Sequence, residues 1–192
     1  MVTSLSSARR RPPALLAGLF LLMFGLGAAT AAHALDVAAG VAFPRGFYEH
    51  ALGVRGEFVS RVDFLPAYLS PVVRLSGYGA TRDGVSLVVG SASPLLKAVA
   101  PGTASTALGF TPYIALGPSF SYLYSWADLE DFGTESNSDF SATLSIFVGV
   151  EFFSNSKISI FGEARQTIPS EFTFDYVMVG LKFRGSRLPG IG

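Results

Sequence analysis

Apolar and polar side chains alternate, one residue at a time, in the second half of the chain. From Phe140 to Phe152 every even-numbered residue is apolar, and most residues between them are small or polar. Because successive side chains of a β-strand point to opposite faces, this stretch predicts a strand with one wholly apolar face. The combination favours lipid on one side of the strand and a narrow polar interior on the other.

Similar alternation predicts eight strands and therefore an all-β fold. They are Leu35–Phe43, His50–Asp63, Val72–Ala80, Val85–Ser93, Thr106–Tyr124, Phe140–Phe152, Lys157–Thr167 and Phe172–Arg184. Several reach the roughly 9–11 residues that a tilted membrane strand needs. An even number suits closure by antiparallel hairpins, so we predict an eight-stranded antiparallel up-and-down transmembrane β-barrel.

Two connections of this barrel are long. Trp126–Asp139 is predicted as an acidic loop on the outer side, opposite a tight turn at Ser154–Ser156 on the periplasmic side. Between Pro94 and Ser105 the pattern leaves two alternatives open, because two prolines interrupt it. The fourth strand either extends into Leu95–Val99 or ends before Pro94.

The N-terminal residues 1–34 have the pattern of a cleaved signal peptide. Three arginines, Arg9 to Arg11, precede the apolar run Ala14–Ala32, and Ala32-His33-Ala34 fits a small-x-small cleavage site. An uncleaved membrane anchor is the alternative, since the run is nearly long enough to span. We expect export by the general secretory route, a barrel over residues 35–184 and a short tail over residues 185–192.

Composition agrees with a membrane barrel. Charged residues make up 15% of the 192 residues, against about 25% in an ordinary soluble domain. The 14 Lys+Arg balance the 14 Asp+Glu, and three arginines fall in the predicted signal peptide, so the mature barrel is mildly acidic and no nucleic-acid partner is expected. The chain has no Cys, which excludes a lipoprotein anchor and a disulfide framework.

The polar face of the strands is predicted to line the barrel interior. It carries Gly, Ala and Ser with scattered charges of both signs, whereas a water-exposed face usually carries many Lys, Glu and Gln. Charges in a low-dielectric interior must be paired, so we predict an interior charge network. Arg165 is expected to neutralise a carboxylate there; solvated surface ions are the alternative. The predicted members are Arg55, Glu57, Arg74, Glu151, Glu163, Arg165 and Lys182.

Aromatic side chains cluster towards the strand ends, as expected for two girdles at the membrane interfaces. Aromatic packing in a soluble core is the alternative. The outer girdle is predicted to contain Tyr122, Tyr124, Trp126 and Phe140, with Phe174 and Tyr176 from the last strand, and the inner girdle Phe152 and Phe183.

The region Tyr113–Gly185 resembles the small outer-membrane β-barrel family of Gram-negative bacteria, the OmpA/OmpX-like porin-type domains. The resemblance lies in Gly149-Val150-Glu151 before the tight turn, Phe161-Gly162-Glu163-Ala164-Arg165 after it, and the alternating Val177–Phe183 at the end. It implies insertion by the barrel assembly machinery through the last strand.

No catalytic, cofactor or metal site is predicted. Some barrels that resemble this class are lipid A-modifying enzymes that use His with Ser and an acid, but no Ser-plus-acid partner of His50 matches their pattern. Carboxylates such as Glu135 and Asp139 in the acidic loop suit cations that bridge to lipopolysaccharide phosphates. A solvated acidic loop is the default interpretation.

The sequence thus predicts a non-enzymatic, monomeric outer-membrane protein of a Gram-negative bacterium, with a structural, envelope-integrity or surface-contact role. Membrane lipid, lipopolysaccharide and, during insertion, the barrel assembly machinery are the expected partners. Eight strands enclose only side chains, so no open channel is expected. A soluble periplasmic lipocalin-like barrel that binds an apolar ligand stays an alternative, because alternation alone does not say which face is outside.

Overall fold

The computed structural model describes residues 32–45, 50–60, 62, 64–82, 84–101, 109–129, 133–154, 156–169 and 174–185. The predicted signal peptide up to residue 31 and the predicted tail after residue 185 lie outside these residues. The strands are β1 (Ala32–Pro44), β2 (Ala51–Ser60), β3 (Leu69–Arg82), β4 (Val85–Val99), β5 (Thr111–Leu129), β6 (Gly133–Phe152), β7 (Ile158–Ile168) and β8 (Tyr176–Arg184). Among the described residues, no helix is long and apolar enough to cross a membrane, a finding that concerns helical spans alone.

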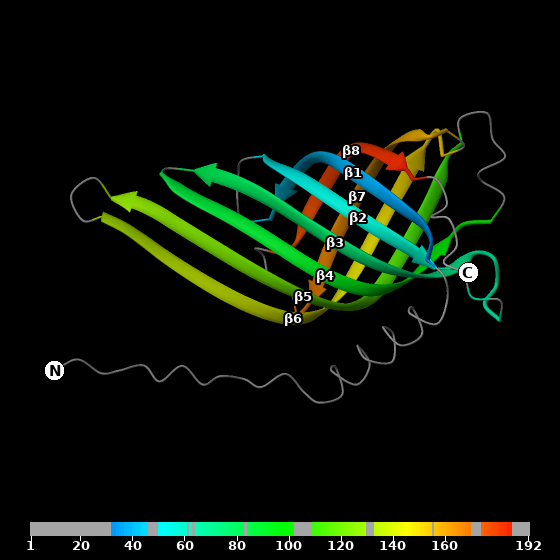
Figure 1. Ribbon diagram of the computed structural model, residues 1–192, viewed down its shortest axis with the longest axis horizontal. Coiled ribbons are helices and arrows are strands. Elements are labelled where there is room, and N and C mark those ends of the chain that lie inside the picture. Colours follow the sequence, from blue (N-terminus) through cyan, green and yellow to red (C-terminus); the bar gives the residue numbers. More distant parts are fainter. Residues whose placement is uncertain are drawn as a thin grey trace.

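The eight strands form one closed barrel in chain order, and β1 pairs with β8 to complete it (Figure 1). Every neighbouring pair is antiparallel, so the predicted all-β, up-and-down fold is confirmed. We call the end with the β1–β2, β3–β4, β5–β6 and β7–β8 hairpins the outer end. The opposite end, where β1 begins and β8 ends, is the inner end.

Two glycines face each other where the barrel closes. Gly40 of β1 is the register partner of Gly180 of β8. A Cβ atom at either position would lie 2.2 Å from a backbone carbonyl oxygen of the opposite strand. No side chain fits at that distance, so the closing seam requires glycine at both positions.

The fourth strand takes the first of the two predicted alternatives and runs through Pro94 to Val99. Pro94 of β4 and Pro118 of β5 lie at the same level, where the β4–β5 ladder is interrupted between Ala92↔Phe120 and Leu96↔Leu116. Because neither proline has a backbone N–H to donate, both fit into a single gap in the ladder.

The predicted Trp126–Asp139 loop is wrong. β5 continues to Leu129 and β6 starts at Gly133, and the two strands stay paired as far as Leu129↔Gly133. The polar composition of residues 134–139 is typical of loops, but cross-strand pairing with the aromatic end of β5 overrides this preference. The resulting hairpin rises well beyond the β1, β2, β7 and β8 ends (Figure 1).

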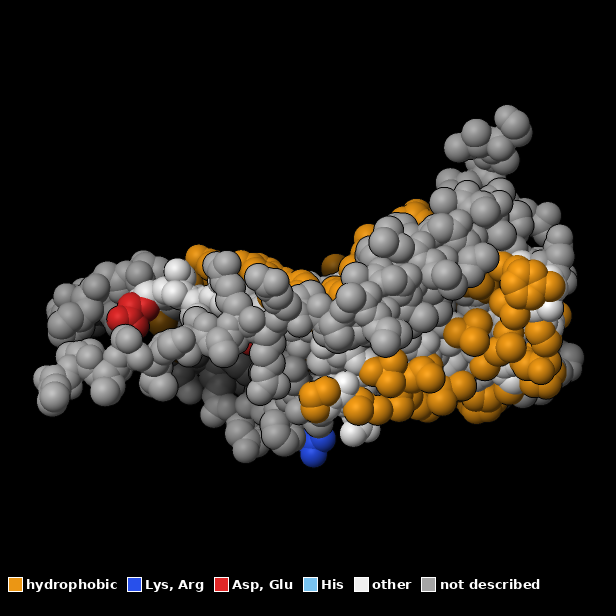
Figure 2. Space-filling view, turned by 90° about the horizontal axis from the view of Figure 1, so that it is seen from below, with side chains coloured by type: hydrophobic (Ala, Val, Ile, Leu, Met, Phe, Trp, Pro, Cys, Tyr) orange, Lys and Arg blue, Asp and Glu red, His pale blue; other side chains and the backbone are white. Residues whose placement is uncertain are grey.

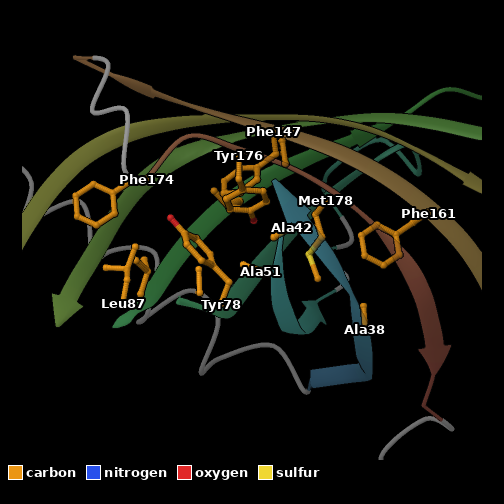
Figure 3. Packing of buried hydrophobic residues seen from close by; sticks show 14 residues of the cluster. Ala38, Ala42, Ala51, Tyr78, Leu87, Phe147, Phe161, Phe174, Tyr176 and Met178 are labelled. Carbon is orange, nitrogen blue, oxygen red and sulfur yellow. The ribbon is translucent and has the colours of Figure 1, made fainter. Parts of the chain in front are cut away.

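The apolar faces of the strands point outward and form a belt around the barrel. Large hydrophobic side chains that are half exposed occur on every strand, and Figure 2 shows them gathered at the end of the molecule away from the long hairpin. Representative members are Val37, Val54, Leu75, Val88, Ile114, Val148, Ile160 and Val179. Buried hydrophobic side chains also line the interior and form one cluster, which includes Tyr78, Phe147, Phe161, Phe174 and Tyr176 (Figure 3).

Candidate functional site

The centre of the barrel interior holds a buried cluster of arginines and glutamates. Arg74 of β3 lies directly opposite Glu57 of β2, and its Nε donates to Glu57 Oε1 at 3.0 Å. Glu163 of β7 reaches the same guanidinium from the other side of the barrel, with its Oε2 2.8 Å from Arg74 Nη1 and 2.9 Å from Arg55 Nη1. All four side chains are almost fully buried.

A second set of ion pairs fills the interior nearer the inner end. Lys182 Nζ lies 2.9 Å from Asp36 Oδ2 and 2.8 Å from Glu151 Oε1. Lys97 Nζ lies 3.2 Å from Glu57 Oε2, which joins the two sets into one network. Four buried cations and four buried carboxylates therefore compensate each other here, as the desolvation cost of each charge requires.

Sequence reasoning missed Lys97 and Tyr113. Lys97 continues the inward alternation of Ser91, Ser93 and Leu95, so it becomes predictable once β4 is extended past Pro94. The Tyr113 hydroxyl donates to Glu163 Oε2 at 2.8 Å, and the Lys97 Nζ lies 4.2 Å from the Tyr113 ring centroid. A tyrosine can thus complete an ionic network that the search for charges alone does not find.

Six of the seven predicted network residues are brought together in this way, and Arg165 is the exception. Arg165 is buried, yet its partners in the described part of the chain are serine hydroxyls: Ser91, Ser119, Ser121 and Ser145 at 3.0–3.3 Å. The expected ion pair between Arg165 and a network carboxylate is not present among the described residues; Asp175 acts on Arg165 from a longer distance. Glu163, two residues away on the same face, is held by Arg55 and Arg74 instead.

The Phe147 ring separates Arg165 from the ionic network. Phe147 is fully buried, with the Arg74 guanidinium carbon 4.2 Å and the Arg165 guanidinium carbon 5.6 Å from its ring centroid. Both cations contact the ring, an arrangement that is favourable because the ring face is electron-rich. The interior consequently has two layers. An inner layer holds the ionic network, and an outer layer, beyond Phe147, holds Arg165 with its serine hydroxyls.

The predicted girdle residues divide between the outside and the inside of the barrel. Tyr122, Tyr124 and Phe140 are exposed near the outer end, and Tyr124 packs against the half-buried Trp126 with ring centroids 5.6 Å apart. Phe152 and Phe183 are exposed near the inner end. The prediction is wrong for Phe174 and Tyr176, which point into the barrel (Figure 3). Tyr176 does so because the inward positions of β8 are even-numbered, and Phe174, two residues before it, is buried too.

Two other predicted features lie at the outer end. His50 is exposed and borders a groove of about 390 Å³ on the outer surface, together with Leu52, Val88 and Trp126. Glu135 and Asp139 are exposed along the long hairpin. Within the described ranges, no group of three or more His, Cys, Asp or Glu residues is placed to hold a metal ion.

The outer part of β6, residues 133–143, forms an open sheet edge among the described residues. On one side it pairs with β5 along its whole length, whereas on the other side β7 pairs only with Leu144–Phe152. Within the described residues, positions 133–143 thus have no strand partner on that side. Such an edge presents unpaired backbone N–H and C=O groups to another chain.

Comparison with known proteins gives a likeness of fold. No protein-family model matches the chain, and no curated protein sequence matches it. Its structure is similar to the crystal structure of Neisserial surface protein A, with a TM-score of 0.50 and 15% identity over 80% of this chain and 94% of that one. The attachment invasion locus protein Ail of Yersinia pestis gives a TM-score of 0.47 and 11% identity over 83% and 99% of the two chains. At these identities the comparison shows the fold, that of a small eight-stranded Gram-negative outer-membrane barrel.

Proposed function

We propose that the protein is an integral, monomeric and non-enzymatic barrel of a Gram-negative outer membrane, whose long hairpin makes surface contacts. The observation that carries the proposal is the reversal of polarity across the wall. Half-exposed Val, Leu, Ile and Phe side chains cover the outside, while the ion pairs lie inside. Hydrocarbon is the solvent in which this distribution is stable, and a closed barrel satisfies its backbone there.

The interior argues against the soluble alternative. A lipocalin-like protein needs an apolar cavity for its ligand and a polar outer face. In this barrel Arg74, Glu57 and Glu163 fill the centre of the interior, and side chains such as Val54 and Val148 are 62% and 54% exposed on the outside. In water, an exposed apolar belt of this extent would drive aggregation.

The long hairpin supports the surface-contact role. The open β6 edge has no lysine and no proline, the residues that commonly block sheet edges. An extended segment of a partner protein can add to such an edge through backbone hydrogen bonds. Because Glu135 and Asp139 are exposed beside the edge, the partner strand that fits it best carries Lys or Arg.

The remaining partners follow from the membrane location. Lipid acyl chains cover the apolar belt, and lipopolysaccharide surrounds the outer rim, where Arg45 has a side chain that is 60% exposed. The barrel assembly machinery would insert the chain from the periplasm after export. The start of β1 and the end of β8 would then lie on the periplasmic side, and the long hairpin would lie outside the cell.

Orientation and location are tested together by cysteine labelling of intact cells, because the chain has no native cysteine. Glu135→Cys on the hairpin should react with a membrane-impermeant maleimide, and the matched variant Ser156→Cys at the inner end should react only after the outer membrane is permeabilised. The protein should fractionate with the outer membrane and change its apparent mass on a gel after boiling. Recovery in the periplasmic extract, or equal labelling of both cysteines, would refute the proposal.

A further inference from the structure

The outer layer of the barrel interior contains a positive charge that has no carboxylate at ion-pair distance among the described residues. Arg165 is 3% exposed and lies beyond Phe147 from the carboxylates of the network. Asp175, a carboxylate at the outer end, accepts hydrogen bonds from the backbone N–H and hydroxyl of Thr167 at 2.7 Å and lies 4.0 Å from Arg45. It attracts Arg165 electrostatically without forming a described ion pair with it. A buried cation without a directly paired counter-charge is costly, so a further group is expected to compensate Arg165.

The hydroxyl groups around Arg165 have hydrogens to donate. An arginine side chain only donates, so each serine oxygen that receives its N–H must turn its own hydrogen elsewhere. Ser91 shares a hydrogen bond with Ser76 at 2.8 Å, and Ser119 shares one with Ser93. Ser121 and Ser145 have no described partner besides Arg165.

A third hydroxyl in the same place lacks any partner. Thr143 is directly opposite Ser119 in the β5–β6 ladder and two residues from Ser145 on the same inward face. Its Oγ1 is buried and makes no hydrogen bond. Tyr176, also buried and the register partner of Arg165 on β8, has an unbonded hydroxyl. Buried polar groups in native proteins nearly always have partners, so these donors indicate an acceptor.

We propose that the outer half of the interior binds a small monovalent anion, of the size and charge of chloride, between Arg165 and the hydroxyls of Ser121, Thr143 and Ser145. The guanidinium supplies the charge. The Ser121 and Ser145 hydroxyls donate to the anion because their oxygens already accept from Arg165, and the Thr143 hydroxyl donates because it has no other partner. The eight-stranded wall limits the space to a small ion. The site goes beyond the proposed surface role and does not depend on which membrane holds the barrel.

Unfolding of the barrel, refolded in detergent, tests the site with chloride as the probe. Wild-type protein is unfolded in urea in sodium chloride and in sodium gluconate at equal ionic strength, so that general screening is the same. Above the dissociation constant, the folding equilibrium constant should rise about tenfold for each tenfold rise in chloride. Gluconate, which is too large for the interior, should have no such effect.

Three variants assign the effect. Arg165→Met should abolish the chloride dependence, and Thr143→Val, which keeps the cation, should weaken it. Arg45→Met removes the same charge from the outer rim and should leave the dependence unchanged. If Arg165→Met does not fold, the Thr143→Val variant and a bromide soak of wild-type crystals decide, because bromide gives an anomalous signal.

An anomalous peak within hydrogen-bond distance of the Ser121 and Thr143 hydroxyls is the expected result. Equal unfolding midpoints in chloride and gluconate would overturn the proposal. So would a chloride effect of the same size in Arg165→Met, or a position occupied by ordered water with no bromide signal.

Discussion

The inner and outer halves of this barrel's interior solve the same problem in different ways. In the inner half, Glu57, Glu151 and Glu163 are interlocked with arginines and lysines, and each charge has an opposite charge within about 4 Å. In the outer half, Arg165 is surrounded by hydroxyls. The difference shows that a buried charge held by ion pairs and a buried charge held by hydroxyls contribute differently to the free energy of unfolding. Removing a member of the inner network leaves directly paired opposite charges without a partner, whereas the groups that hydrogen-bond Arg165 are neutral hydroxyls.

The largest effect is expected at the centre of the ionic network. Arg74→Met removes the cation shared by Glu57 and Glu163 and leaves both carboxylates short of a partner. We expect a loss of about 3–5 kcal/mol in the free energy of unfolding. Urea unfolding of the refolded barrel in detergent measures it. Arg45→Met at the exposed rim is the control, and a loss no larger than the control's would show that the network does not hold the barrel together.

The next effect concerns the outer face. Val148 lies near the middle of the apolar face of β6 and is 54% exposed. Val148→Arg should cost about 2–4 kcal/mol when the barrel unfolds from a lipid bilayer, because the charge faces hydrocarbon. Ser136→Arg, on the same face of the hairpin above the belt, should change little. Equal tolerance of both arginines would mean that water covers the Val148 face.

A smaller effect is expected for the outer layer. Arg165→Met keeps much of the side-chain volume and removes a charge that forms no described ion pair with a carboxylate. Measured in gluconate, its unfolding free energy should lie within about 1 kcal/mol of the wild type, since replacing buried charge by apolar volume is often neutral. A loss as large as that of Arg74→Met would erase the distinction between the two layers.

The smallest effect is expected on the hairpin. Glu135 and Asp139 are exposed, whereas Glu163 is fully buried. Combined Glu135→Gln and Asp139→Asn should alter the free energy of unfolding by less than about 0.5 kcal/mol, as solvated surface charges do. Glu163→Gln, which deprives Arg55 and Arg74 of a carboxylate, is the buried comparison in the same unfolding assay. A substantial loss in the hairpin variant would indicate ion pairs that the described residues do not contain.

The barrel itself was predictable because its signal is repeated in every strand. Alternation of period two marks each inward and outward position, and it correctly assigns Arg55, Glu57, Arg74, Glu151, Glu163 and Lys182 to one face. Their mutual contacts also depend on register and on reach across the interior. Glu163 of β7 meets Arg74 of β3, and no local pattern records that meeting.

The errors share a physical origin. The composition of residues 134–139 resembles a loop, and only pairing with β5 keeps this segment extended. Phe174 and Tyr176 have the composition of a girdle, but Tyr176 occupies an inward position of β8 and Phe174, just before that strand, is buried as well. Arg165 shares its face with Glu163, yet Phe147 stands between Arg165 and the network. In each case a long-range neighbour outweighs the local preference.

The central claim is that hydrocarbon contacts the outward face of the strands. The fluorescence of a single tryptophan on that face can test this contact. The chain has a single tryptophan, so Trp126→Phe gives a silent background. Val148→Trp or Glu135→Trp is then introduced, and the barrel is placed in vesicles with brominated acyl chains. We predict strong quenching by the brominated lipid for Val148→Trp and quenching by aqueous iodide alone for Glu135→Trp. Quenching of Val148→Trp by iodide, without any effect of the brominated lipid, would contradict the account.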